Sequence, residues 1–495
     1  MNDAFERLLT IHPELETSRR GLPFPGTRKD GLTFFDDVKV IDEAFVNSNI
    51  MYSYETIIDK RLVLFNAGAG SPLYTKPYPP ATKAIREIAG SEKLSQYQLA
   101  AGDAECRQSI VEWLNEEGFG CNYELTSSNI IFTHSTTEGF DFLIKLLTRA
   151  YDAVLFSGPT YGLFVYVPER NNAISKIIPL SKDDDWLINP QKLDTKIQKI
   201  NRELEELGKK LNLSYKPCCV AYVNINPNNP TGKVMTEKHI PLLRELYATC
   251  EKNGMWIIDD LIYRELVYDA DKKAIAMATI EGLGKNVISM LGPSKSYGLA
   301  GVRAGMIIAD EIVIRGIRPI VFQHMDSTSL ITGTILKACY NHSEEHEKYF
   351  DIIRSEYRKK YQLIRMLIEG VDSIDEEYSN YYKEIIASKY PDCWKQIIEP
   401  IDDIKVAEEI YPESGFFLML DFTASKGKRY KEVCINSESD ILYFYYVYAY
   451  VKLLMGKSIG WPNGEQFIAR VSFSFSDDEI ILMIKQMKDA ARRLE

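Results

Sequence analysis

Short apolar runs alternate with segments of helical spacing between about residues 80 and 340. AECRQSIVEWLNEEGFG, which starts at Ala104, places apolar residues three and four positions apart and ends in glycine, as a helix does. NIIFTH and DAVLFSG predict buried strands, with the helical stretch EGFDFLIKLLTRA between them, and CCVAYVNIN, MWIIDD and NVISMLG continue the series. This alternation predicts an α/β fold, a mainly parallel sheet covered by helices on both faces, in which ligands bind beyond the carboxyl ends of the strands.

Three segments interrupt this rhythm. Residues 192–216 are charged, with Glu and Lys at helical spacings, and predict a solvated surface helix. Residues 371–412 are rich in Tyr and acidic side chains and indicate an insertion in a second domain. The stretch SDILYFYYVYAYVKLLMG, at 439–456, is aromatic but contains Asp and has polar flanks, so we expect a packed helix and not a membrane anchor.

Composition narrows the classes of function. The chain is 45% apolar and 26% charged, which is typical of globular proteins. Its 495 residues are too many for one ordinary hydrophobic core. The net charge of -11 argues against nucleic acid as a partner, because phosphate binding needs a basic face. The apolar runs are shorter than the roughly 18 residues of a membrane span, and the acidic start is unlike a signal peptide, so we expect a cytoplasmic protein without membrane contact.

The cysteines predict no metal site. The chain has eight cysteines without CxxC spacing and only six histidines, which makes a structural zinc site improbable. The adjacent pair Cys218 and Cys219 is better explained as part of a buried strand. In a cytoplasmic protein these thiols stay reduced.

Three motifs carry candidate chemistry, and each has a simpler explanation when taken alone. LGPSKSYGLAGVRAG, at 291–305, holds Lys295 and an arginine eight residues later; a lysine after an apolar run is usually a solvated strand end. NINPNNPTG, at 224–232, consists of common turn residues. WIIDDLIYREL, at 256–266, ends a buried run in two aspartates, and a carboxylate there also suits a helix cap.

Together, in this order and spacing, the three motifs resemble the class I and II aminotransferases, which are pyridoxal-phosphate enzymes of fold type I. The resemblance extends from FNAGAGSP near residue 65 to FIARVSFSFS near residue 475. It implies a large cofactor domain at 76–340 and a smaller α+β domain from both chain ends. The smaller domain would comprise an N-terminal arm and adjoining part at 1–75 and a C-terminal part at 341–495, with the insertion near 371–412.

The resemblance assigns Lys295 as the residue that forms a Schiff base with the cofactor aldehyde. An amine is nucleophilic only when neutral, and a partly buried site beside other cations lowers a lysine pKa. Arg303 matches the arginine that clamps the cofactor phosphate with its planar fork, and Ser294 offers a hydroxyl. The family often has a serine three residues before the lysine, where this chain has Gly292, which leaves the phosphate cup one donor short.

The same resemblance assigns residues around the cofactor ring. Asp260 matches the carboxylate that keeps the pyridine nitrogen protonated, and its neighbour Asp259 is expected to point to the other face of the sheet. Tyr263 and Asn229 match the two groups that hydrogen-bond the phenolic oxygen, and Asn229 also faces the substrate. The Asn229–Pro230 bond resembles one that is often cis in this family.

Further residues are assigned upstream. In FTHSTTEGF, Ser135, Thr136 and Thr137 match a strand-to-helix turn that holds the phosphate, although helix capping explains them too. In GPTYG, Tyr161 matches an aromatic ring that stacks on the cofactor, where a core or turn tyrosine is the alternative. Tyr97 matches a tyrosine that reaches the phosphate of the neighbouring subunit, which implies a homodimer with shared active sites.

Two residues are assigned to the substrate. Arg470, in EQFIARVSFSFS, matches the arginine that grips the α-carboxylate, although alone it would be interpreted as a surface residue. Gly70, in NAGAGSP, would bring backbone close to the substrate, because glycine has no side chain in the way. No metal is expected in this site.

The resemblance thus predicts transamination between an L-amino acid and a 2-oxo acid, with Lys295 as general base and acid and with ping-pong kinetics. The alternative is another pyridoxal-phosphate reaction on the same fold: a lyase or cyclase like aminocyclopropane-carboxylate synthase, a β- or γ-eliminase, a decarboxylase or an oxidase. A second alternative is a non-catalytic regulator that keeps the cofactor fold. The identity of the amino acid and of the acceptor is left open.

Overall fold

The computed structural model describes residues 58–495, and these form two compact units. Residues 1–57 of the predicted N-terminal arm lie outside the described residues. The predicted domain boundaries at 75 and 340 stay a prediction, whereas the compact units divide the chain at other positions. The large unit consists of Gly70–Tyr361 and Tyr411–Phe417, and the described part of the small unit consists of 58–69, Gln362–Ile410 and Leu418–Glu495.

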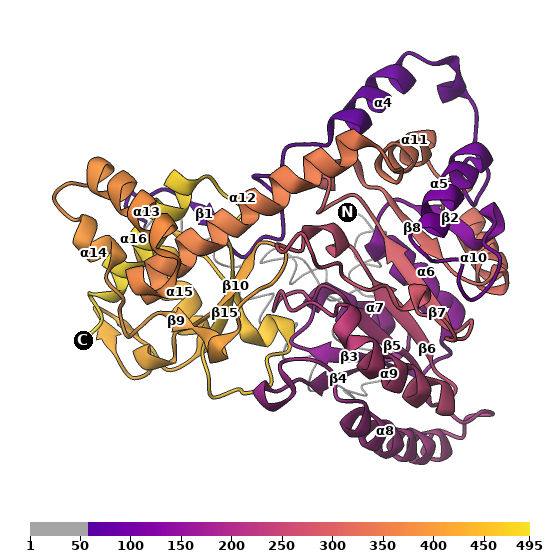
Figure 1. Ribbon diagram of the computed structural model, residues 1–495. Coiled ribbons are helices and arrows are strands. Elements are labelled where there is room, and N and C mark those ends of the chain that lie inside the picture. Colours follow the sequence, from indigo (N-terminus) through magenta and orange to yellow (C-terminus); the bar gives the residue numbers. More distant parts are fainter. Residues whose placement is uncertain (1–57) are drawn as a thin grey trace, which may run out of the picture. The chain divides into compact units, whose positions relative to one another are not determined.

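The large unit is built on a seven-stranded sheet with the order β2-β8-β7-β6-β5-β3-β4 (Figure 1). Strand β8 runs antiparallel to its neighbours β2 and β7, and the other described strand pairs of this sheet are parallel. The strands are β2 Ile130–Thr133, β3 Ala153–Gly158, β4 Ile174–Pro179, β5 Cys219–Ile225, β6 Trp256–Asp260, β7 Val287–Leu291 and β8 Gly305–Ile308.

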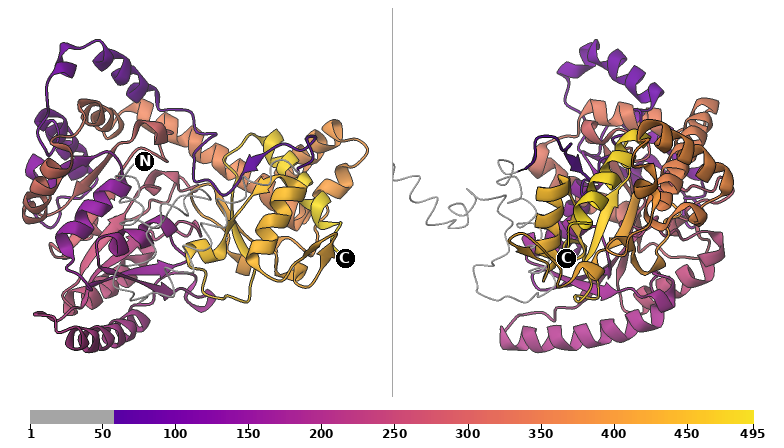
Figure 2. Two further views of the ribbon diagram at one scale, coloured as in Figure 1. Left: turned by 180° about the vertical axis from the view of Figure 1, so that it is seen from behind. Right: turned by 90° about the vertical axis from the view of Figure 1, so that its left-hand side faces the viewer.

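Helices cover both faces of this sheet, as Figures 1 and 2 show. Helix α6 (Thr136–Leu147) packs against β2, β7 and β8 and against two further helices, α7 (Gly162–Arg170) and α10 (Glu311–Met325). Helix α8 (Pro190–Lys210) packs with α9 (Ile240–Lys252) over β5 and β6. The chain passes from β2 to β3 and on to β4 in one direction along the sheet, through α6 and α7. It returns in the other direction to β5 and β6, through α8 and α9. Because such crossovers are right-handed, α6 and α7 lie on one face of the sheet and α8 and α9 lie on the other.

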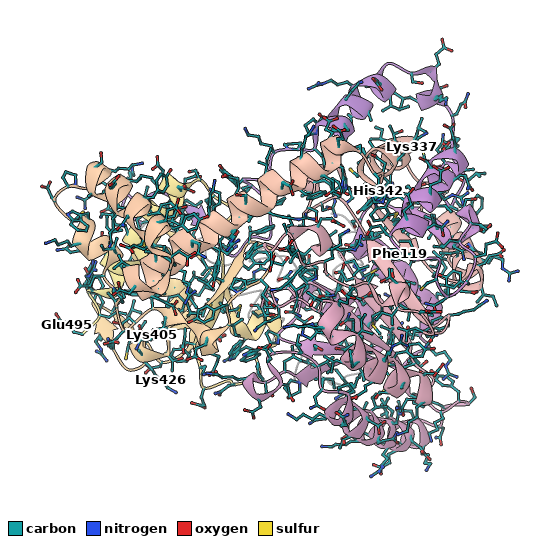
Figure 3. The ribbon with its side chains drawn as sticks, viewed as in Figure 1. Phe119, Lys337, His342, Lys405, Lys426 and Glu495 are labelled. Atoms are coloured by element: carbon teal, nitrogen blue, oxygen red, sulfur yellow. The ribbon has the colours of Figure 1, made fainter. Side chains whose placement is uncertain are left out.

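A second layer of helices borders the large unit. Helix α11 (Leu330–Cys339) packs against α4 (Pro79–Ala89) and α5 (Ala104–Glu116). Lys337 of α11, labelled in Figure 3, donates to Glu105 of α5 at 3.1 Å. The long helix α12 (Glu344–Glu369) follows α11.

The described part of the small unit combines short strands with helices. Its largest sheet has the order β14-β15-β10-β9, and two pairs, β1-β13 and β11-β12, stand apart from it. The strands are β1 Phe65–Asn66, β9 Lys405–Val406, β10 Phe417–Asp421, β11 Arg429–Tyr430, β12 Val433–Cys434, β13 Val451–Lys452, β14 Leu454–Met455 and β15 Ile468–Ser472. The helices are α13 Glu376–Lys389, α14 Trp394–Ile398, α15 Glu438–Ala449 and α16 Asp477–Ala491.

The predicted fold class is found, with one local correction. Every apolar run predicted as a strand of the large sheet is a strand. The stretch at 439–456, predicted as one packed helix, is helical only to Ala449, because Tyr450 adopts the left-handed conformation with φ 53° and the chain continues as β13 and β14. Among residues 58–495, no helix is both long enough and apolar enough to cross a membrane.

Candidate functional site

Most of the predicted site residues follow the carboxyl ends of parallel strands in the large unit. Ser135 follows β2, Tyr161 follows β3, Asn229 follows β5 and Lys295 follows β7, while Asp260 is the last residue of β6. Because parallel strands end at the same edge of a sheet, the topology gathers these residues along one edge. This is the edge at which the sequence predicts ligand binding.

Lys295 lies in a tight turn between β7 and β8. The amide of Tyr297 and that of Leu299 both donate to the carbonyl of Pro293, at 3.2 and 3.4 Å. The half-buried Lys295 side chain turns back, and its Nζ donates to the carbonyl of Gly70 at 2.5 Å. Lysine and the predicted substrate-facing glycine are therefore brought together, and Lys295 is not a solvated strand end.

The two aspartates that end β6 have different surroundings. Asp259 is fully buried and accepts hydrogen bonds from Asn224 Nδ2 at 2.7 Å and from the Met277 amide at 2.8 Å. Asp260 is 3% exposed and accepts a hydrogen bond from the Ile262 amide at 3.2 Å. Successive strand residues point to opposite faces, so the expectation that Asp259 turns away from Asp260 agrees with these contacts.

Burial dominates the titration of both aspartates. It raises the pKa of Asp260 to about 7; Asp259 raises that pKa further, and the nearby Lys295 lowers it. Burial likewise raises the pKa of Asp259 to about 6, against the lowering effect of Met277 and Asn224. Asp260 and Lys295 thus interact electrostatically at the carboxyl edge of the sheet, and a cation bound beside Asp260 would hold this carboxyl ionised.

The start of α6 forms a cup suited to an anion. Ser135 caps the helix by accepting from the Glu138 amide at 3.1 Å, so the capping interpretation is right for this residue. Ser135 and Thr136 are buried, and Thr137 is half-buried. Backbone amides and the positive end of the helix dipole at such a turn favour negative charge.

Two glycines bring other backbone close to this cup. A Cβ on Gly305, which pairs with Thr133 across β2 and β8, would lie 2.7 Å from the Thr136 amide nitrogen. A Cβ on Gly292 would lie 3.2 Å from Thr136 Cγ2 and 3.1 Å from the Ala304 carbonyl. The serine that the family often carries at position 292 would therefore crowd this cup, which gives a steric reason for the glycine.

Arg303 lies directly before Ala304 and Gly305 and adopts the left-handed conformation, with φ 55°. Its side chain is exposed, and Nη1 donates to the Ala300 carbonyl at 3.0 Å. Arg303 lies two residues before Gly305, whose backbone packs against the start of α6.

His134 is a member of the cup that the sequence did not single out. Its amide donates to Glu138 Oε2 at 2.7 Å, and its Nδ1 lies 3.4 Å from Glu138 Oε1. The hydrogen bond to Glu138 raises the pKa of His134, and burial and the charge of Arg303 lower it. The position of His134 directly before Ser135 is the signal that could have identified it.

The remaining predicted residues of the carboxyl edge are enclosed by the protein. Asn229 is 5% exposed and precedes a cis peptide bond to Pro230, as the resemblance implies. Tyr263 is 4% exposed and packs edge-on against Phe416, with ring centroids 5.8 Å apart. Tyr161 is half-buried at the start of α7, and Ser294, in the lysine turn, is 6% exposed.

Two predicted residues do not join this group within the large unit. Tyr97 is 86% exposed and lies between a short 3₁₀ turn, Glu92–Ser95, and α5. Arg470 belongs to β15 of the small unit, where it is 3% exposed and its Nη2 donates to the Gly68 carbonyl at 2.6 Å. Arg470 is therefore a buried residue and not a surface one.

The carboxyl edge of this mainly parallel α/β sheet thus carries a lysine, a buried carboxyl group and a helix start that favours negative charge. The chain belongs to the class I and II aminotransferase family, whose family model matches residues 62–400. Among residues 58–495, no cluster of three or more His, Cys, Asp or Glu side chains could hold a metal ion.

Relatives agree with this assignment. The chain is 24% identical over 357 residues to an LL-diaminopimelate aminotransferase of Maridesulfovibrio salexigens, covering 71% of this chain and 81% of the relative. It is 26% identical over 246 residues to an aromatic aminotransferase of Arabidopsis thaliana, covering 48% of this chain and 53%, about half, of that relative. The solved aspartate aminotransferase of Rhizobium meliloti matches the fold with a TM-score of 0.70 and 15% identity, over 95% of this chain and 99% of that one.

These comparisons confirm the predicted family, the fold type and the class of enzyme: the chain is an aminotransferase. The family itself implies amino acids and 2-oxo acids as the substrates. The roles of the individual site residues stay predictions.

Proposed function

We propose that this aminotransferase transfers the amino group of an L-amino acid to a 2-oxo acid with pyridoxal phosphate held on Lys295. The observation that carries the proposal is the position of Lys295 and the buried Asp260 at the carboxyl ends of the neighbouring parallel strands β7 and β6, on the sheet edge at which α6 begins after β2. These groups match the cofactor one by one. The amine suits its aldehyde, the carboxylate suits its pyridine nitrogen, and the anion cup suits its phosphate.

The residues present fit this cofactor. Asp260 is almost fully buried, and burial raises its pKa, because an ionised carboxyl without a positive partner is unfavourable away from water. A protonated pyridine nitrogen beside Asp260 would supply the missing positive charge. The buried Ser135 and Thr136 at the start of α6, together with Arg303 near that turn, suit a phosphate dianion.

The chain's own residues would divide the work as follows. Pyridoxal phosphate, when bound, supplies an aldehyde and a ring that withdraws electrons from the substrate α-carbon. The neutral Lys295 Nζ would take the α proton and return it to the neighbouring carbon, as general base and then general acid. Tyr263 and Asn229 would hydrogen-bond the ring oxygen, and Tyr161 would pack on the ring face.

The hydroxyls around the cup would complete the phosphate site. Ser294, Thr136 and Thr137 each offer one hydroxyl, and Ser135 offers its amide while its own oxygen caps α6. With Gly292 in place of a serine, we propose that the helix start and Arg303 carry most of the phosphate binding.

Three residues are proposed to bind the substrate, namely Arg470, Gly70 and Asn229. In the small unit, the fork of Arg470 is suited to a planar α-carboxylate and keeps one nitrogen, Nη2, on the Gly68 carbonyl. In the large unit, the backbone at Gly70 and the side chain of Asn229 would face the substrate. The amino acid side chain and the acceptor are not assigned.

The alternative is a different pyridoxal-phosphate reaction on the same fold, such as elimination, decarboxylation, cyclisation or oxidation. The named relatives are aminotransferases, which favours transamination. Transamination releases a 2-oxo acid and no ammonia, carbon dioxide or peroxide, so product analysis separates the two proposals.

Two further predictions rest on the sequence and the resemblance. We propose a homodimer in which Tyr97 of each chain reaches the phosphate of the other site, which agrees with the 86% exposure of this tyrosine in a single chain. We also propose a cytoplasmic location.

The test of the proposed function is the variant Lys295→Ala, compared with Lys233→Ala. Lys233 is a second lysine of the large unit and forms an ion pair with Asp185 at 2.7 Å. We expect Lys295→Ala to lose at least about 10³-fold in kcat, because it removes the general base, while Lys233→Ala stays within about threefold. A Lys295→Ala protein that is folded and keeps full turnover would contradict the proposal.

A further inference from the structure

Tyr297 connects the lysine turn to the start of α12. It follows Lys295 by two residues, and its side chain is completely buried. Its hydroxyl oxygen lies 3.0 Å from Nε2 of His346, a residue of the first turn of α12 that is 4% exposed. This hydrogen bond is buried and spans 49 residues of sequence.

Aromatic rings surround this hydrogen bond and leave little freedom to the Tyr297 ring. Three of them meet it edge-on and one is stacked on it, arrangements that are favourable for aromatic pairs. The ring centroids of Phe350, Tyr78, Tyr340 and Tyr349 lie 5.0, 5.4, 5.5 and 6.4 Å from that of Tyr297.

The backbone around Tyr297 is also tied to a second segment. The Tyr78 amide donates to the Tyr297 carbonyl at 3.0 Å, and the Tyr349 hydroxyl of α12 donates to the Lys76 carbonyl at 2.8 Å. Gly298 adopts φ +65°, and a Cβ there would lie 2.9 Å from the Lys76 carbonyl oxygen. The lysine turn, the segment at 76–78 and α12 therefore form one packed assembly.

His346 is suited to accept the hydrogen bond from the Tyr297 hydroxyl. The Ser343 hydroxyl oxygen accepts from the His346 amide at 3.2 Å, and Nδ1 lies 3.4 Å from Glu347 Oε1. An imidazole whose Nδ1 carries the proton accepts at Nε2. Burial lowers the pKa of His346; Glu265 and Glu347 oppose this change, and His342 adds to it.

We propose that His346 is a positioning residue for Lys295 and acts through its hydrogen bond to Tyr297. This inference rests on the proposed function of Lys295. The Tyr297 side chain extends from the lysine turn to α12. Its hydrogen bond to His346 therefore holds the backbone of Lys295, two residues away, in position. Lys295 Nζ must reach two positions, the Gly70 carbonyl that it contacts here and the reacting carbon. A small displacement of the Lys295 backbone changes both distances.

The test compares Tyr297→Phe with Tyr340→Phe. Both variants remove one hydroxyl from the same aromatic cluster, but only Tyr297 bonds to His346. We expect Tyr297→Phe to lower kcat about tenfold, with KM changed by less than about twofold, since geometry at the reacting atoms and not substrate binding is altered. We also expect a shift of about half a pH unit or more in the pH titration of the visible absorption of the cofactor on Lys295.

Tyr340→Phe should change the unfolding midpoint at most, and leave kcat and the titration within experimental error. A second pair separates the hydrogen bond from packing: His346→Gln retains an acceptor, and His346→Leu has none. We expect His346→Gln to keep kcat within about threefold of the wild-type value, and His346→Leu to resemble Tyr297→Phe.

The inference is overturned if Tyr297→Phe and Tyr340→Phe change only the unfolding midpoint, or if His346→Leu equals His346→Gln in kcat and in the titration. A wild-type protein that shows neither the visible absorption nor amino transfer would overturn the proposed function and the inference with it. Wild-type absorption with unaffected variants would overturn the inference alone.

Discussion

At the scale of single residues, the two aspartates that end β6 show how neighbouring side chains of one chemical type take different roles. Asp259 is held by Asn224 and the Met277 amide, whereas Asp260 accepts from the Ile262 amide at the carboxyl edge of the sheet, where Lys295 also lies. The sequence predicted this division from the alternation of a strand. It did not predict the partner Asn224, because a cross-strand hydrogen bond leaves no pattern in a single sequence.

The first prediction separates these two aspartates. Asp260→Asn should lower kcat by at least about 10²-fold, because it removes the charge opposite the cofactor ring. Asp259→Asn should lower the unfolding midpoint and leave kcat within about threefold, since Asp259 faces the interior. Steady-state kinetics and thermal unfolding measure both. Equal losses of kcat in the two variants would contradict the assignment of Asp260.

The second prediction concerns the pH dependence of the cofactor-free protein. The pKa of Asp260 is raised from its ordinary value to about 7, so between pH 4 and 7 the folded state binds a proton that the unfolded state has lost. Stability therefore falls as pH rises through this window. We expect the difference in unfolding free energy between wild type and Asp260→Asn to change by about 1–2 kcal/mol from pH 5 to pH 7.

Added pyridoxal phosphate should reduce this pH dependence, because a cation beside Asp260 stabilises the ionised carboxyl. Denaturant titrations at the two pH values, with and without cofactor, provide the measurement. An identical pH dependence in wild type and Asp260→Asn would show that Asp260 titrates normally in the folded protein.

At the scale of elements, the anion cup depends on the close approach of β8 to the start of α6. The apolar runs identified five strands of the large sheet, but neither β4 nor β8. Strand β8 follows a glycine-rich motif with no α-helix between it and β7, so the alternation of strands and helices does not indicate it. The helix cap at Ser135 could be predicted, whereas the packing of Gly305 against it could not.

The third prediction tests this approach. Gly305→Ala should lower the unfolding free energy by about 1–3 kcal/mol and weaken pyridoxal-phosphate binding, because its Cβ would lie 2.7 Å from backbone of the α6 start. Gly301→Ala is the matched control, since a Cβ there meets nothing within 4 Å. Denaturant unfolding and fluorescence titration with the cofactor measure the two effects. Similar behaviour of both variants would contradict the described cup.

The fourth prediction concerns the small unit. Lys488 of α16 is fully buried, and its Nζ donates to the carbonyls of Ile397 and Glu399, at 2.8 and 2.6 Å, where α14 ends. Lys488→Met should lower the unfolding free energy by about 2 kcal/mol, because both buried carbonyls lose their donor. Lys485→Met removes only the pairing with Asp489 one turn away and should cost about 0.5 kcal/mol or less. Equal destabilisation would contradict this role.

At the scale of the whole molecule, the family, the fold type and the class of enzyme could be predicted, because they depend on motifs that are local in sequence. The boundaries of the compact units and the Tyr297–His346 hydrogen bond could not, because they join residues far apart in the chain without any periodic signal. Contacts with a neighbouring subunit leave no such signal either, and the predicted homodimer rests on the family resemblance at Tyr97.

The fifth prediction concerns assembly. We expect the mass of two chains in sedimentation equilibrium and, for Tyr97→Phe, a dissociation constant for pyridoxal phosphate about tenfold higher than wild type, through loss of one charge-assisted hydrogen bond. Tyr381→Phe, which alters another exposed tyrosine, should bind the cofactor as wild type does. A monomeric protein whose Tyr97→Phe variant binds the cofactor normally would contradict the shared site.

The most direct test of the central claim is absorbance between about 300 and 500 nm while amino acids and 2-oxo acids are added in turn to the cofactor-loaded protein. We predict a visible band that requires Lys295, disappears with one amino acid and returns with a 2-oxo acid, without release of ammonia, carbon dioxide or peroxide. Recovery of the band without any 2-oxo acid, or a band that persists in Lys295→Ala, would contradict amino transfer through Lys295.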